Sequence, residues 1–137
     1  MADSLKTLAS PRGTLVYRET AATSSDPDDS GNNNVFAKAD ATLYGVKIDA
    51  TSNTAENVYL CLYHDTTAAG SGVTVGTTEP QMVFKCIKGS SVEILFPCGV
   101  AITGQSDTFL HFAVKQEAGT AGSTAPTGTV AITLIGA

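Results

Sequence analysis

The stretch 58–63, VYLCLY, decides how the chain is expected to fold, because it places apolar side chains at six consecutive positions. Successive side chains of a β-strand point to opposite faces of a sheet, so this strand would be apolar on both faces. The stretch 109–114, FLHFAV, repeats the pattern with one histidine. Such strands lie either in the centre of a domain, covered on both sides, or at an interface between subunits. The sequence leaves both alternatives open.

Short strand-like segments separated by turn residues run along most of the chain, and helical periodicity is nearly absent. The segment 108–118 resembles an amphipathic helix, but its aromatic and β-branched residues favour a strand. The predicted strands are Thr14–Glu19, Thr42–Ala50, Asn57–His64, Met82–Ile87, Ser91–Phe96, Val100–Thr103, Phe109–Lys115 and Thr129–Ile135. A tight hairpin is predicted at Lys88-Gly89-Ser90, and a strand boundary is predicted where Pro97 and Gly99 flank Cys98.

Alternation within the predicted strands indicates a core. The sets expected to face it are Tyr44, Val46 and Ile48; Val92, Ile94 and Phe96; and Val130, Ile132 and Leu134. About eight short strands with Gly, Ser and Thr loops predict an all-β fold, a single β-sandwich of jelly-roll-like type. We expect residues 35–137 to form this domain and residues 1–34 to form an extended N-terminal arm with a flexible loop. The strand order cannot be read from the sequence.

The composition excludes several classes of function. At 137 residues the chain is expected to form one domain. Charged residues make up 15% of the chain, against about 25% in an average protein, which predicts a surface of small uncharged residues suited to contact with other subunits. The eight Lys and Arg residues are scattered singly and the net charge is −5, so direct binding of nucleic acid is not expected. A membrane span is not expected either, because no apolar run approaches roughly 20 residues. A secretory signal is not expected, because the N-terminal residues show no positively charged region followed by an apolar stretch.

Three long loops stand out, at Thr20–Asn34, Asp65–Pro80 and Glu117–Pro126. The last two are rich in Ala, Gly, Ser and Thr, and each ends at a proline. Loops longer than about 12 residues are usually functional or disordered. We expect these loops either to move in solvent or to lie on another chain.

The first of these loops contains Asp26–Asn34, DPDDSGNNN, which resembles the start of an EF-hand calcium loop. The twelfth position should be a bidentate glutamate, but it is Ala37, and Pro27 interrupts the loop. The flanking segments are not predicted as helices. We therefore interpret the segment as a loop that is solvated or ordered by a partner, and whether it binds any ion stays open.

Catalytic and metal-ligating patterns are weak. The two histidines, His64 and His111, are both on predicted strands, and no third ligand accompanies them. Cys61 and His64 are three residues apart, so on a strand they point to opposite faces and cannot pair. Cys61, Cys86 and Cys98 are expected to be reduced thiols packed as small apolar groups. We predict no catalytic residue, no metal ligand and no cofactor, and the chain is not expected to be an enzyme.

The segment Asn57–Gln105 resembles small virion proteins of tailed bacteriophages. The resemblance lies in a V-Y-L-x-L-Y strand, a polar loop, the motif VGTTEP at Val75–Pro80, and a strand that ends in PCGVA at Pro97–Ala101. The C-terminal TAPTGTVAITLI, Thr124–Ile135, is similar to the closing strand of these proteins. About the last 80 residues take part, and the first 40 contribute nothing.

This resemblance implies a structural protein of the virion, assembled in the host cytoplasm. Within that class the size and the β-sandwich favour a capsid decoration (cement) protein that bridges capsid subunits as a homo-oligomer. Its partners would be the major capsid protein or other virion subunits. A neck or tail component is the first alternative, and a carbohydrate-binding module is a more distant one.

Overall fold

The computed structural model describes residues 15–24, 35–36, 40–67, 71–101 and 108–137. Within these residues the fold is all-β, with seven strands and no helix. The strands are β1 Leu15–Glu19, β2 Thr42–Asp49, β3 Val58–Asp65, β4 Met82–Cys86, β5 Ser91–Ala101, β6 Phe109–Lys115 and β7 Ala131–Gly136. The described part of the chain accordingly contains no helix long and apolar enough to cross a membrane.

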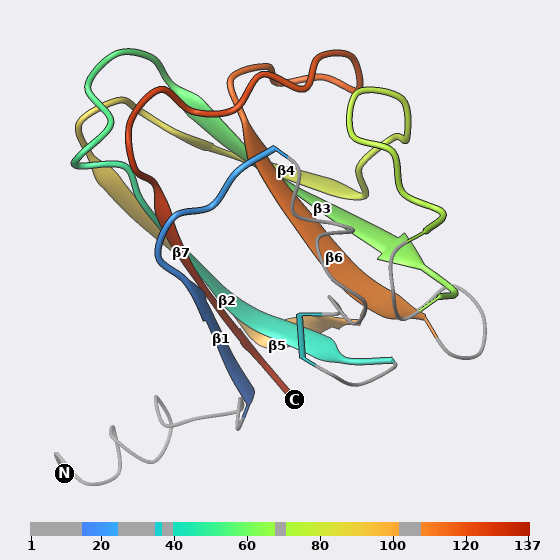
Figure 1. Cartoon of the computed structure of the whole chain (residues 1–137). Helices are drawn as coiled ribbons and strands as arrows, with labels where there is room; N and C mark the ends of the chain where they lie inside the picture. The colour runs from blue at the N-terminus through green and yellow to red at the C-terminus, as the bar shows by residue number, and fades with distance from the viewer. Residues whose placement is uncertain (1–14, 25–34, 37–39, 68–70, 102–107) are drawn as a thin grey trace, which may run out of the picture.

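The strands form two antiparallel sheets, which face each other as a β-sandwich (Figure 1). Sheet A has the order β1-β7-β2-β5, and sheet B has the order β4-β3-β6. Sheet A therefore combines strands from the beginning and the end of the chain, whereas sheet B is built from its middle part. The prediction of an all-β sandwich is confirmed.

Most of the core lies between the two sheets, where apolar side chains alternate along the strands. Val130, Ile132 and Leu134 are buried as predicted. In β2 the alternation shifts, because the pairing with β5 and β7 is irregular between Leu43 and Gly45. Leu43 is consequently fully buried and Tyr44 only half-buried. The prediction that placed Tyr44 on the core face was wrong, since a strict period of two cannot anticipate a β-bulge.

Two predictions of strand connection were also wrong. The predicted strand Ser91–Phe96 and the described part of the predicted strand Val100–Thr103 belong to one strand, β5, which continues through Pro97. A proline is tolerated there because β5 is an edge strand and its N–H side need not bond a neighbour. Lys88-Gly89-Ser90 forms a turn, with Gly89 at φ 69°, but not a hairpin. β4 lies in sheet B and β5 in sheet A, so the chain crosses between the sheets at this turn.

Part of the segment predicted as an N-terminal arm belongs to the sandwich. β1 pairs with β7 along its whole length, and Ala22 is buried in the core. Backbone hydrogen bonds then follow the outer edge of β6: Val114 N–H donates to the Thr23 carbonyl, and Val35 N–H donates to the Leu110 carbonyl. Residues 1–14 and 25–34 lie outside the described residues, so the arm itself stays a prediction.

Candidate interaction surface

The outer face of sheet B is covered by two loops of the same chain (Figure 1). Val73 and Val75, from the loop after β3, pack against Cys61, Tyr63 and Ala113 in a second apolar cluster. The loop after β6 covers the neighbouring part of the face, as its contacts with Lys115 show. The expectation that the loops Asp65–Pro80 and Glu117–Pro126 move in solvent or lie on another chain was wrong for their described residues. Between the two alternatives for the doubly apolar strands, the structure decides for burial within the domain.

Lys115 holds the second loop in place. This lysine lies on the outer face of β6 and is fully buried. Its Nζ donates hydrogen bonds to four backbone carbonyls of the loop, at 2.6 Å (Gly119), 3.1 Å (Thr120), 3.3 Å (Ala121) and 2.9 Å (Gly122). Burial of a charged group is costly unless hydrogen bonds replace its hydration, and these carbonyls provide that replacement. A run of small residues wraps closely around the ammonium group because no large side chain keeps it away.

Carboxylates fix the two loops at their ends. The Asp65 carboxylate accepts hydrogen bonds from the Gly72 N–H and the Thr67 hydroxyl, both at 2.6 Å. Burial opposes ionisation of Asp65, but these bonds outweigh it and lower its pKa. In the second loop the Glu117 carboxylate accepts bonds from the hydroxyl and the N–H of Thr124, which lower the pKa of Glu117. Both loops are therefore best held when these carboxylates are ionised.

Beneath the loops lie three titratable side chains that sequence reasoning considered only singly or not at all. The Tyr63 hydroxyl is buried beside the Cys61 thiol and makes no well-formed hydrogen bond among the described residues. Burial raises the pKa of both groups, so both stay protonated near neutral pH. His111 Nε2 lies 3.2 Å from the Thr67 carbonyl oxygen. A buried neutral thiol without a path to solvent is a packing group and not a nucleophile.

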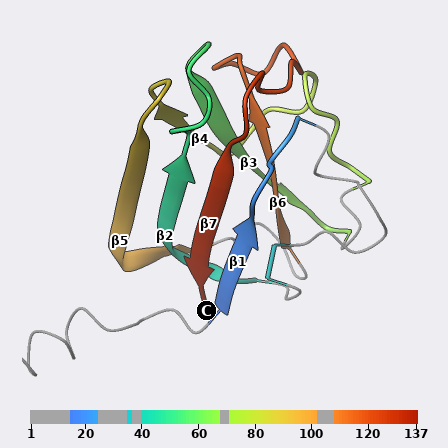
Figure 2. The same ribbon diagram turned by 60° about the vertical axis from the view of Figure 1, so that its left-hand side comes forward.

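The outer face of sheet A differs, because no described segment crosses it (Figure 2). Strand register aligns Val16, Ile135, Gly45 and Leu95 in one line across all four strands. Val16 is 56% exposed and Leu95 is 63% exposed. A Cβ built on Gly45 would lie 3.2 Å from Leu95 Cδ2 and 3.6 Å from Ile135 Cδ1, so these side chains close over the glycine. We call these four residues the apolar row.

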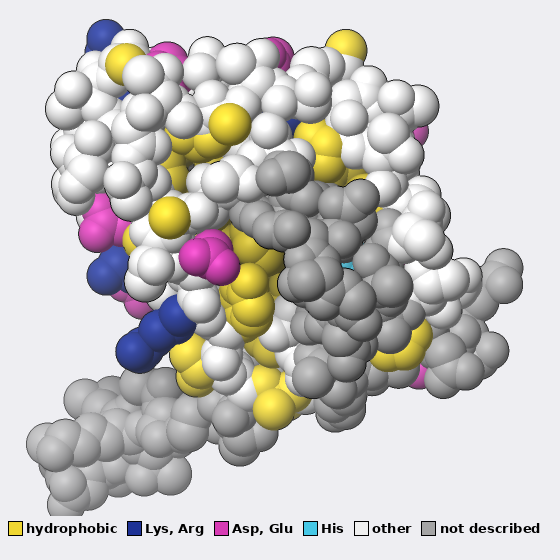
Figure 3. Space-filling model, in the orientation of Figure 1, with side chains coloured by type: hydrophobic (Ala, Val, Ile, Leu, Met, Phe, Trp, Pro, Cys, Tyr) yellow, Lys and Arg dark blue, Asp and Glu magenta, His cyan; other side chains and the backbone are white. Residues whose placement is uncertain are grey.

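A second line of outward residues follows at the next level of the sheet. It contains Arg18, Thr133, Lys47 and Glu93, aligned by the same strand pairs. We call it the charged row. Its positive residues lie on β1 and β2 and its negative residue on β5. On the face shown in Figure 3, the Lys, Arg, Asp and Glu side chains are scattered among uncharged groups.

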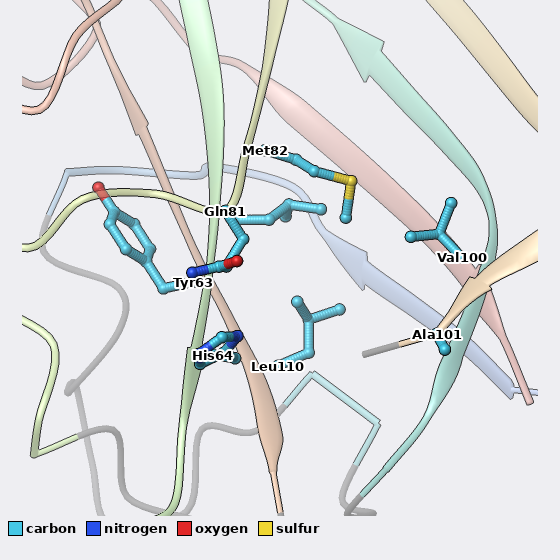
Figure 4. Close-up of a pocket in the computed structure, with 8 residues that line it drawn as sticks. Tyr63, His64, Gln81, Met82, Val100, Ala101 and Leu110 are labelled. Carbon is cyan, nitrogen blue, oxygen red and sulfur yellow. The ribbon is translucent and has the colours of Figure 1, made fainter. Parts of the chain in front are cut away.

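One pocket opens between the two sheets (Figure 4). Its volume is about 160 Å³, and its apolar wall comes from Leu62, Met82, Val100 and Leu110. His64 also lines the pocket, whereas the Tyr63 ring points to the other side of β3. A pocket of this size is smaller than the roughly 300 Å³ at which ligand sites usually begin.

The structure places the residues considered as sites in separate environments. Asp26–Asn34, with its calcium-like pattern, lies outside the described residues. Cys61 is on the covered face of sheet B, and His64 lines the pocket from the opposite face of β3, so the two do not meet. Cys61, Cys86 and Cys98 are free thiols; the first two are packed as predicted, but Cys98 is exposed. In the described residues no three His, Cys, Asp or Glu side chains gather as a metal site.

The apolar row was missed by sequence reasoning. Leu95 alternates correctly with Ile94 and Phe96 and so could be assigned to the solvent face, but its neighbours in the row come from three distant strands. Strand order was the missing information. Comparison of the chain with protein-family models, with curated proteins and with solved structures finds no significant match.

Proposed function

We propose that this chain is a non-enzymatic structural protein of a bacteriophage virion, and specifically a capsid decoration protein that stabilises the head by bridging capsid subunits. The observation that carries the proposal is the outer face of sheet A, where Val16 and Leu95 of the apolar row are exposed, while the comparable face of sheet B is covered. A soluble domain rarely leaves an aligned apolar strip in water unless another molecule contacts it.

Two further features support the proposal. Charged residues make up only 15% of the chain, and those on the face in Figure 3 are scattered, so contact with another subunit desolvates few charged side chains. The order of the described strands, β1-β7-β2-β5 facing β4-β3-β6, is compatible with a jelly-roll topology. The jelly roll, the phage origin and the location in the virion remain part of the proposal, as do the partners: the major capsid protein, other virion subunits and further copies of this chain.

Electron microscopy of purified particles with and without this protein tests the proposal. We expect repeated density on the head surface that disappears when the protein is absent. Density confined to the neck or tail would favour the alternative structural role. Particles that contain none of the protein, by mass spectrometry, would overturn the proposal.

The predicted arm gives a second test. Deletion of residues 2–12 removes chain that precedes β1 and should leave the sandwich folded, because β1 begins at Leu15. We expect the shortened chain to bind heads poorly if the arm lies across neighbouring subunits. Unchanged occupancy on heads would show that the arm takes no part in attachment.

The carbohydrate-binding alternative has no support from the aromatic side chains. Sugar sites usually present exposed aromatic rings, but every Tyr and Phe of the chain is buried or half-buried. A glycan array is the direct measurement, and we expect no hits.

A further inference from the structure

We propose that the outer face of sheet A binds a second copy of this chain, in a two-fold dimer whose axis runs parallel to the strands between β7 and β2. The inference rests on the proposed function, in which the chain serves to bind other protein subunits. It adds the identity of one partner and the residues that contact it.

A two-fold axis in this direction reverses the strand order of the second copy relative to the first. β1 of one copy faces β5 of the other, and β7 faces β2, with each level of the sheet facing the same level. Within the apolar row, Val16 then meets Leu95 of the second copy, and Ile135 meets Gly45 of the second copy. Apolar side chains that are exposed in the monomer become covered on both copies.

The charged row has matching signs under the same operation. Arg18, on β1, faces Glu93, on β5 of the second copy, and the symmetry makes this pair twice. Lys47 faces Thr133, so no like charges of this row are opposed. A two-fold axis across the strands, along the apolar row, would instead place Val16 on Val16 and leave the charged rows on opposite sides. Only the axis parallel to the strands pairs both rows.

The size of the face sets the strength of the contact. Four strands about 4.8 Å apart and about six residues long give a flat area of roughly 400 Å² per copy. A standard stable interface buries about 800 Å² per partner. We therefore expect a dimer that dissociates on dilution and that becomes persistent when other contacts hold the copies together, as in an assembly.

Sedimentation equilibrium of the purified full-length chain over a concentration series tests the inference. We expect a monomer–dimer equilibrium. Leu95→Lys should raise the dissociation constant of the dimer at least about tenfold, because a charge replaces a leucine that the dimer buries. The matched control is Ile87→Lys, since Ile87 is 61% exposed and Leu95 is 63% exposed, but Ile87 lies outside sheet A. Equal effects of both substitutions would overturn the assignment of the face.

A charge exchange tests the orientation. Arg18→Glu and Glu93→Arg should each weaken the dimer about tenfold, since each changes two symmetry-related pairs. The double variant should restore it. Cross-linking adds a direct readout in a Cys98→Ser background: Val16→Cys mixed with Leu95→Cys should give a disulfide-linked heterodimer. Efficient linkage of Val16→Cys to itself would overturn the axis.

The outcomes separate this inference from the proposed function. A chain that is monomeric at every concentration but binds heads would overturn the dimer and leave the proposed function standing. If Leu95→Lys abolished head binding in that case, the face would belong to the capsid. A chain that dimerises as described but is absent from particles would support the dimer and overturn the virion role. A monomer that dimerises only after deletion of residues 2–12 would show that the arm covers the face, and would overturn the dimer of the full chain.

Discussion

The outer faces of the two sheets differ in what covers them. On sheet B, the loops after β3 and β6 lie over Cys61 and Ala113, and Lys115 is bound by carbonyls of one loop. On sheet A, Val16 and Leu95 remain exposed and no described segment crosses the strands. The difference shows that an apolar outer face does not by itself predict an interface, because long loops of small residues can cover it from within the same chain.

Loss of the Lys115 ammonium group should have the largest effect, because it removes the group that holds the second loop on the outer face of sheet B. Lys115→Met keeps the apolar stem but leaves four carbonyls of the loop without their donor. We expect the free energy of unfolding to fall by about 3 kcal/mol, which is the scale of hydrogen bonds to a buried charged group. Chemical denaturation measures the change, and labelling with a thiol reagent should show Cys61 becoming reactive in addition to exposed Cys98.

Lys85→Met is the matched control for that substitution. Lys85 and Lys115 are both cross-strand neighbours of Tyr59, one on each side, but Lys85 is exposed. We expect a change within about 0.5 kcal/mol and no new reactive thiol. If Lys115→Met behaved like its control, the lysine would not be what holds the loop on sheet B.

A glycine of the same loop should have the next largest effect. Gly122 has φ 88°, and a Cβ there would lie 2.5 Å from the Glu117 side chain. Gly122→Ala should therefore cost about 2 kcal/mol of stability, from backbone strain and crowding. Gly119→Ala is the control, because a Cβ on Gly119 meets nothing within 4 Å. Equal melting temperatures for the two variants would contradict the described loop conformation.

Tyr63→Phe should change stability in the opposite direction. The Tyr63 hydroxyl is buried without a well-formed hydrogen bond among the described residues, so its removal should stabilise the fold by up to about 1 kcal/mol. Tyr59→Phe, at a half-buried position on the same face of β3, is the comparison. A loss of stability in Tyr63→Phe would mean that the hydroxyl has a partner, for which the neighbouring Cys61 thiol is the first candidate.

Acid should loosen the cover of sheet B. Hydrogen bonds from Thr124 hold the pKa of Glu117 below its ordinary value of 4.5, and bonds from Thr67 and Gly72 hold that of Asp65 below 3.8. Because the unfolded chain binds protons more tightly at these groups, their stabilisation is present above the ordinary values and is lost as the pH falls below them.

The melting temperature measured between neutral pH and pH values below 4.5 checks this expectation. Glu117→Gln mimics the protonated state and should reduce the slope in that window. Glu79→Gln, at an exposed position of the other covering loop, is the comparison. An identical acid response in both variants would show that Glu117 does not couple the loop to pH.

Particular residues show how far the sequence alone could go. Alternation in Thr129–Ile135 fixed which side chains enter the core, and Phe109–Lys115 was predicted with the bounds that the structure has, because steric and solvent preferences of a strand are local. The shifted alternation at Tyr44 and the continuation of β5 through Pro97 were not predictable, since both depend on pairing with a neighbouring strand.

For the outer faces of the two sheets, local sequence and tertiary structure also determined different things. The sequence by itself determined that 58–63 needs cover on both sides, because apolar side chains alternate to opposite faces whatever surrounds them. Only the tertiary structure decided that the cover is the chain's own loops, held by Lys115, and that Val16, Ile135 and Leu95 form one line. These contacts join residues far apart in the chain, and their geometry follows from strand order and register, which no local pattern encodes.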